Sequence, residues 1–271
     1  MGPQASGAVD RLGVDPYGAL AGSFVSHYAT LRGVVRLELM ARQLDAHLAP
    51  PPASIVDVGG GAGHVSVPLA ARGHEVTLLD TSPEMLRRAR AAVNRSSEEV
   101  RRRVTLVQGS GLDGAAALGR SRFDAVLCHG VLMYLDDPEP CVRALAELCR
   151  PGGIVSVLAK NADALALRPA LLGRFDDARA AFESDRDVGG LGVVTRGDTV
   201  DGLTRHLAAS EVEVVAWYGV RVLTDHRIGE PPGGDIEDVV AAEWEAGRRD
   251  PYRGIARLIH VVGRKRSAGE R

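Results

Sequence analysis

The chain has 271 residues, 45% hydrophobic and 25% charged, which are the proportions of a folded globular protein, and this length suits one α/β domain with insertions. The 33 Lys and Arg residues nearly balance 35 Asp and Glu residues, and a net charge of −2 argues against a surface devoted wholly to nucleic acid. No apolar run reaches the ~20 residues that a membrane span needs, and no secretory leader is evident, so we expect a cytoplasmic protein. The three cysteines lack the spacing of metal ligands, so we expect no metal.

The first half of the chain predicts an alternation of strands and helices. Residues 1–22, rich in Gly, Ala and Pro, are expected to form a flexible tail, and the helical spacing from Tyr28 to Leu48 ends before Pro50. Predicted strands are Ser54–Val58, Glu75–Asp80, Val104–Gln108, Phe123–Cys128 and Ile154–Leu158, and predicted helices are Ala62–Arg72, one opened by Ser82 and Pro83, and Asp137–Arg150. Strands that are almost uniformly apolar predict a parallel sheet covered on both faces.

The second half adds insertions to this pattern. Residues 162–200 form a mixed, Gly-rich and acidic segment, and residues 224–250 form a second insertion. Between and after them we expect a helix over Thr199–Ala209, a strand over Val212–Trp217 and a strand over Arg257–Gly263 at the C-terminal edge. The predicted domain therefore spans residues 23–263 and is followed by a basic tail, 264–271. Cys141 and Cys149 are expected on one face of the predicted helix, in the core.

A glycine-rich loop follows the first predicted strand. Glycines at this point let the backbone approach a ligand, and the helix that follows offers free N–H groups to it. Asp80 ends the second strand, where its carboxylate can accept hydrogen bonds from ribose hydroxyls. This combination predicts a nucleoside cofactor without deciding which one; the loop residues are Asp57, Gly59, Gly60, Gly61 and Gly63.

Three further motifs narrow the choice of cofactor. They are the acidic residue two positions before the glycines, FDAVLCH followed by VLMYLDDP, and LCRPGG before the fifth strand. Together with the glycine loop, these pieces over residues 54–160 resemble the class I S-adenosylmethionine-dependent methyltransferases. The resemblance implies S-adenosylmethionine as cofactor and S-adenosylhomocysteine as product. It also implies a Rossmann-like, doubly wound seven-stranded sheet, mostly parallel with one antiparallel strand.

Segments outside these motifs resemble the bacterial methyltransferases that esterify the carboxylate of 5-carboxymethoxyuridine in tRNA. They include YATLRGVVRLEL, GVRVLTDHRIGE and DPYRGIARLIHVVGRK. The resemblance implies cofactor contacts at Arg36, Gly59, Gly60, Asp80, Gly111, Leu112 and His129. We add Asp57, Gly61, Gly63, Thr81 and Met85 to the expected cofactor site.

The nature of the acceptor decides which residues would be catalytic. A carboxylate needs no base but needs a cation to hold it, for which we favour Arg221 over Lys160, with an ion pair between Arg221 and Asp225 as an equal alternative. A phenol or amine would instead need a base, for which the candidates are His129, His226 and His260.

The acceptor itself stays open between tRNA and a small molecule. The end-to-end resemblance favours tRNA, whereas the acidic stretch Ala180–Asp187 stands where the tRNA enzymes carry lysines. A regulator that binds the cofactor without catalysis, and a nicotinamide-dependent oxidoreductase, are less favoured alternatives. A homodimer is also left open.

Overall fold

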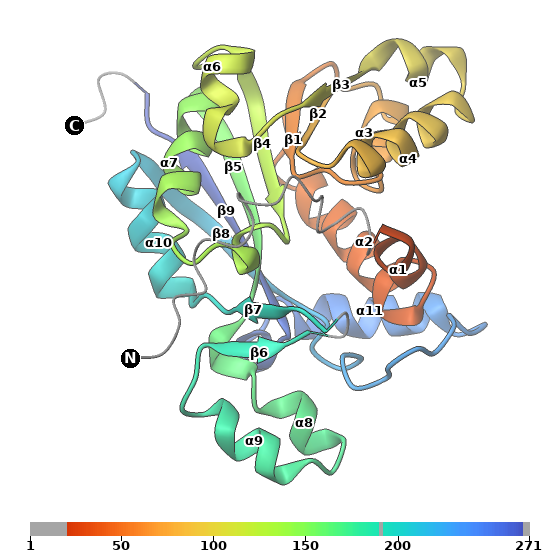
Figure 1. Cartoon of the computed structure of the whole chain (residues 1–271), viewed down its shortest axis with the longest axis vertical. Helices are drawn as coiled ribbons and strands as arrows, with labels where there is room; N and C mark the ends of the chain where they lie inside the picture. Colours follow the sequence, from red (N-terminus) through yellow and green to blue (C-terminus); the bar gives the residue numbers. More distant parts are fainter. Residues whose placement is uncertain (1–20, 190–191, 268–271) are drawn as a thin grey trace.

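A computed structural model describes residues 21–189 and 192–267 and is built around one seven-stranded sheet (Figure 1). The strand order is β3-β2-β1-β4-β5-β9-β8, and β9 runs antiparallel to both of its neighbours. This arrangement confirms the predicted mostly parallel sheet with one antiparallel strand. The strands are β1 Ser54–Val58, β2 Glu75–Asp80, β3 Val104–Gln108, β4 Phe123–His129, β5 Cys149–Lys160, β8 Val212–Val220 and β9 Leu258–Lys265.

Helices cover both faces of the sheet, which explains why the central strands are apolar along their whole length. One face packs against α6, α7 and α10, and the other packs against α2, α3 and α5. The helices are α1 Ala21–His27, α2 Leu31–Asp45, α3 Ser66–Ala71, α4 Pro83–Asn94, α5 Glu98–Arg103, α6 Gly114–Leu118, α7 Glu139–Leu148, α8 Leu167–Leu171, α9 Phe175–Ala181, α10 Val200–Ala209 and α11 Ile236–Ala246. No helix in these described ranges is long and apolar enough to cross a membrane.

Side-chain caps and the glycine loop set the helix boundaries. The Ser82 hydroxyl accepts from the Met85 N–H, as expected for the start of α4 at Pro83. Helix α2 begins at Leu31, later than predicted, because the Thr30 hydroxyl caps it. Helix α3 was expected from Ala62 but begins at Ser66, since the loop before it uses positive φ angles that no α-helix adopts.

Two other expectations about the core were wrong. The last strand, β9, is not at an edge: it lies between β5 and β8, so that β8 is the edge strand. Cys149 begins β5 instead of sharing a helix face with Cys141 in α7, because α7 ends at Leu148. Both thiols are nevertheless buried in the core, together with Cys128.

The insertions lie beyond the carboxyl ends of the parallel strands. Figure 1 shows α8, α9 and the β6–β7 hairpin (Arg186–Val188 and Val194–Arg196) together below the sheet, where β5 ends at Lys160. Helix α11, from the second insertion, packs on α2. Parallel α/β sheets bind ligands at this edge, so the insertions surround the expected site. The predicted tail over residues 1–22 lies almost entirely outside the described residues and stays a prediction.

Candidate active site

The glycine loop between β1 and α3 is shaped by backbone conformations that only glycine adopts without strain. Gly59, Gly61 and Gly63 have φ angles of +70°, +57° and +83°. The Gly59 N–H donates to the Leu79 carbonyl at 2.7 Å, which ties the loop to the end of β2. A side chain at Gly59 would collide with Val131, and one at Gly60 would lie 2.7 Å from Leu78. The loop therefore stays close to the sheet edge and leaves the space above it open.

Asp80 ends β2 and organises the backbone around it. Its carboxylate accepts from the Gly61 N–H at 2.8 Å and from the Ser82 N–H at 2.9 Å. One carboxylate thus joins the glycine loop to the start of α4. Of the two residues that we predicted beside it, Thr81 is exposed and Met85 is buried on α4.

Asp57 lies beneath the loop instead of facing outward. It is 2% exposed, and its Oδ2 accepts from the Ser66 hydroxyl at 2.6 Å. Burial raises the pKa of this carboxyl to about 6, although the hydrogen bond from Ser66 acts in the opposite direction. This placement supports the loop and the start of α3 from below.

Arg36 reaches the same edge from helix α2. Its guanidinium donates to the His129 carbonyl at 3.2 Å and lies 5.5 Å from the centre of the Tyr28 ring. Tyr28 in turn stacks on His64 with ring centres 4.0 Å apart. Arg36 forms no ion pair with any carboxylate in the described part of the chain, so its charge is available to a ligand. Our sequence reasoning missed the stack of Tyr28 on His64, because nothing in the local sequence links these residues.

Gly111 and Leu112 complete this edge beyond β3. A Cβ atom at Gly111 would lie 2.5 Å from a methyl group of Val58, so the chain can pass the end of β1 only as glycine. The Leu112 side chain is 52% exposed, although it is large and apolar. The contacts of Val58 with Gly111, of Gly61 with Asp80 and of Arg36 with His129 bring the predicted cofactor residues together at one edge.

His129 belongs to a buried hydrogen-bonded chain that crosses three strands. Its Nε2 lies 2.9 Å from the Ser156 hydroxyl, which lies 2.7 Å from Nε2 of His260. The Nδ1 of His260 lies 2.7 Å from the amide oxygen of Gln43 on α2. Burial lowers the pKa of His129 well below its usual value and that of His260 to about 3, so both rings are neutral. His260 has both nitrogens bonded and no exposed surface, which fits a structural role.

A second group of charges gathers where β5, β8 and β9 meet the insertions. We call Arg32, Lys160, Arg168, Arg221 and Arg257, with Asp187 and Asp225, the arginine cluster. Asp187 pairs with Lys160, with Arg257 at 2.5 Å and with Arg168 at 3.6 Å. Asp225 lies 3.3–3.9 Å from the guanidinium nitrogens of Arg32, Arg168, Arg221 and Arg257. The sequence analysis named Arg221 and Lys160 as candidate cations for an acceptor carboxylate, but it did not single out Arg32, Arg168 or Arg257.

Burial lowers the pKa of four cations of the arginine cluster, namely Arg32, Lys160, Arg168 and Arg221. It lowers the pKa of Arg221 to about 10 and that of Lys160 to about 8. The half-buried His27 has a pKa lowered to about 4 by burial and then by Arg221, Arg32 and Arg36. The positive charges of Arg36 and Arg221 therefore both act on His27, while the charge of Asp225 opposes them.

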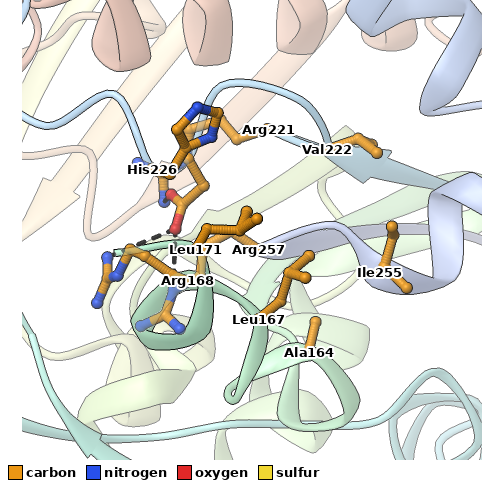
Figure 2. A pocket seen from close by; sticks show the side chains of 10 residues that line it. Ala164, Leu167, Arg168, Leu171, Arg221, Val222, His226, Ile255 and Arg257 are labelled. Carbon is orange, nitrogen blue, oxygen red and sulfur yellow. Dashed lines mark ion pairs between the residues drawn. The ribbon is translucent and has the colours of Figure 1, made fainter. Parts of the chain in front are cut away.

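A pocket opens on the arginine cluster (Figure 2). It is partly open to solvent, and Arg168, Arg221 and Arg257 line it together with Asp225 and His226. Its remaining wall is apolar and consists of Ala164, Leu167, Leu171, Val222 and Ile255. We call this space the arginine pocket.

A buried carboxylate holds the loop that carries Arg221. Arg221 adopts a left-handed backbone conformation, φ +61°, which is unusual for a residue with a side chain. Directly after it, the Val222, Leu223 and Thr224 N–H groups and the Thr224 hydroxyl all donate to Glu243 on α11. Glu243 is fully buried, and the sequence carried no signal for this role.

Comparisons with known proteins agree with this architecture. A family model described as a methyltransferase domain matches residues 56–155. The tRNA 5-carboxymethoxyuridine methyltransferase of Escherichia coli (strain K12) is 28% identical over 244 residues, which cover 88% of this chain and 91% of that protein. The ubiquinone biosynthesis O-methyltransferase of Xanthomonas campestris pv. campestris (strain B100) is 36% identical over 139 residues, which cover 51% of this chain and 54% of that protein.

Among solved structures, the S-adenosylmethionine-dependent methyltransferase of Mesorhizobium loti superposes with a TM-score of 0.58 at 22% identity. The match covers 84% of this chain and 98% of that one, and it shows the fold alone. The matched family model covers the glycine loop, Asp80 and the strands that carry them. The chain is therefore an S-adenosylmethionine-dependent methyltransferase built on the class I fold.

Proposed function

We propose that the protein transfers the methyl group of S-adenosylmethionine to a carboxylate oxygen of an anionic acceptor. The observation that carries this proposal is the arginine cluster, which contains more cations than carboxylates and lies where β5, β8 and β9 meet the insertions. Buried cations of this kind favour an anionic partner, because an unpaired buried charge is costly.

The residues at the glycine-loop edge fit the cofactor. The space above Gly61 is open, Asp80 offers carboxylate oxygens for ribose hydroxyls, and Arg36 offers a guanidinium without an ion-pair partner for the methionine carboxylate. Gly111 and the exposed Leu112 would flank the adenine. When bound, S-adenosylmethionine supplies a methyl group activated by a sulfonium.

Arg221 is our choice as the anchor of the acceptor carboxylate. A carboxylate is ionised at neutral pH, so the protein needs to orient it and to exclude water rather than to remove a proton. We assign no base, because an ionised carboxylate has no proton to remove. The Nε2 of His129 is engaged with Ser156 while its buried Nδ1 has no hydrogen-bond partner among the described residues, and His260 is enclosed in the core. Both candidate cations form ion pairs, Lys160 with Asp187 and Arg221 with Asp225. Arg221 nevertheless keeps a buried Nε–H group without a hydrogen-bond partner among the described residues, so we choose it as the anchor and Lys160 as a supporting cation. An ester product is neutral and loses the attraction of the cluster, which favours its release.

The variant Arg221→Ala tests this assignment. Loss of one partner of a buried charge pair costs ~2–5 kcal/mol, so we expect KM for the acceptor to rise at least tenfold. The dissociation constant of S-adenosylhomocysteine should stay unchanged. Arg227→Ala is the matched control, since Arg227 lies six residues further on, is 36% exposed and pairs only with Glu230 among the described acidic residues. Unchanged turnover and acceptor affinity in Arg221→Ala would remove Arg221 from the mechanism.

A tRNA nucleoside is the acceptor that the relatives favour most. The match with the E. coli tRNA enzyme covers 88% of this chain and 91% of that protein. The acidic stretch Ala180–Asp187 argues less strongly against tRNA binding than its composition indicated, because Asp187 pairs with Lys160 and Arg257 instead of facing solvent. Glu183 and Asp185 remain exposed there, however.

A small carboxylic acid is the second candidate, supported by the way α8 walls the arginine pocket with Leu167 and Leu171. Radiolabelled methyl transfer to bulk tRNA from a strain lacking this gene, beside a small-molecule extract of that strain, separates the two. Base-labile label on tRNA supports the nucleoside carboxylate, and base-labile label only in the extract supports the small acid. Label that resists base in both samples would refute carboxylate methylation.

A further inference from the structure

The charges of the arginine cluster do not balance. Five cationic side chains share the carboxylates of Asp187 and Asp225, which leaves an excess of three positive charges. The five cations are between 4% and 12% exposed at their side chains, so water compensates little of this charge. One bound acceptor carboxylate would balance only one of these three positive charges.

Hydrogen bonds in the arginine cluster are also incomplete. Neither carboxylate oxygen of Asp225 accepts a hydrogen bond, although four guanidinium groups surround it. Buried N–H groups without a partner remain at Nε of Arg168 and Arg221 and at Nη1 of Arg257. Buried donors are normally satisfied, so these N–H groups can still take a hydrogen-bond acceptor from a ligand.

The unused donors belong to residues that line the arginine pocket. Arg221 and Arg257 are 8% and 4% exposed, and both line this space together with Arg168 (Figure 2). The room between these side chains is about that of one water molecule, so a larger anion requires the side chains around it to move apart. The opposite wall, with Leu167, Leu171 and Ile255, is apolar and suits the organic part of a ligand.

We propose that the arginine pocket is a subsite for a second, non-reacting anionic group of the acceptor, a phosphate or a second carboxylate. Planar guanidinium forks pair with both of these groups through two hydrogen bonds. The subsite rests on the proposed function in that the acceptor carboxylate is methylated next to it. It narrows the acceptor to molecules with at least two negative charges, and it explains why four arginines converge where one would hold a single carboxylate.

Binding of simple anions tests the subsite without any methyl transfer. The full chain is titrated calorimetrically with inorganic phosphate and, separately, with malonate, at constant ionic strength and with S-adenosylhomocysteine present to fill the cofactor site. Saturable binding of phosphate alone identifies a phosphate group, and binding of malonate alone identifies a carboxylate. The anion that binds should also inhibit methyl transfer in competition with the acceptor. No saturable binding of either anion would overturn the proposal.

Variants of Arg168 place the binding in this pocket. Arg168→Gln should weaken anion binding at least about tenfold, and Arg168→Lys should weaken it less, because the charge stays while the fork is lost. Arg174→Gln is the matched control, since Arg174 is a 54% exposed arginine just beyond α8. Equal anion affinity in Arg168→Gln and the wild type would overturn the assignment to this pocket.

A second variant guards against a folding defect in Arg168→Gln. Ile255 is 47% exposed on the apolar wall, so Ile255→Trp fills the pocket without removing a charge. It should also weaken anion binding, while its affinity for S-adenosylhomocysteine stays at the wild-type value. Anion binding without any carboxylate ester formed would keep the subsite and refute the proposed function. Ester formation without anion binding would refute the subsite and keep the proposed function.

Discussion

Replacing Glu243 by Gln tests whether one buried carboxylate holds the acceptor side of the site in place. Glu243 Oε2 accepts from the Val222 N–H at 2.8 Å, while Oε1 accepts from the Leu223 and Thr224 N–H groups and the Thr224 hydroxyl. These contacts fix the loop in which Arg221 has its left-handed conformation. Gln has almost the same shape, but it carries one acceptor oxygen and no charge.

The expected loss follows from these hydrogen bonds. If the amide oxygen takes the place of Oε1, the amide nitrogen faces the Val222 N–H and one hydrogen bond to a charged group is lost, about 1.5–3 kcal/mol. The three remaining bonds become neutral and weaken by roughly half. We therefore expect the free energy of unfolding to fall by at least about 4 kcal/mol, the lower end of these combined losses, with KM for the acceptor raised and the affinity for S-adenosylhomocysteine unchanged.

Urea denaturation and cofactor titration measure these two effects. Glu245→Gln is the matched control on the same helix, because Glu245 is 46% exposed and pairs with Arg248 and Arg249 at the surface. Its loss should stay within about 0.5 kcal/mol. Should Glu243→Gln unfold at the same urea concentration as Glu245→Gln, the loop is not held by this carboxylate.

Two further predictions concern the cofactor edge and the buried lysine. Asp80→Ala removes the acceptor for the Gly61 and Ser82 N–H groups. It should weaken S-adenosylhomocysteine binding by ~1–3 kcal/mol, measured by calorimetry. The control Glu75→Ala, at the exposed start of the same strand, should leave this affinity unchanged. Burial depresses the pKa of Lys160 from 10.5 to about 8, so between these pH values the folded state binds fewer protons than the unfolded state. The contribution of Lys160 to stability therefore rises from pH 8 to pH 10.5 and is lowest below pH 8. Unfolding of Lys160→Met should lack this rise, and equal pH dependence in both proteins would contradict it.

The sequence by itself determined the sheet and most of the cofactor edge. Apolar strands followed by turns and amphipathic helices are local signals, and they predicted β1 to β5 in order. Because the carboxyl ends of parallel strands meet at one edge, strand ends alone brought Gly59, Asp80 and His129 together. Strand ends were predicted less well: β5 was expected over Ile154–Leu158, but it begins earlier, at Cys149, and ends at Lys160.

The arginine cluster, in contrast, was decided only by the tertiary structure. Arg32, Arg168, Arg221 and Arg257 stand far apart in the chain and follow no common spacing, and only the packing of α2, α8 and the ends of β8 and β9 brings them around Asp225. An arginine in a loop looks the same in a sequence whether it faces solvent or a buried carboxylate. Long-range electrostatics has no periodicity along the chain, so charges that pair across insertions become visible only once the fold has placed them.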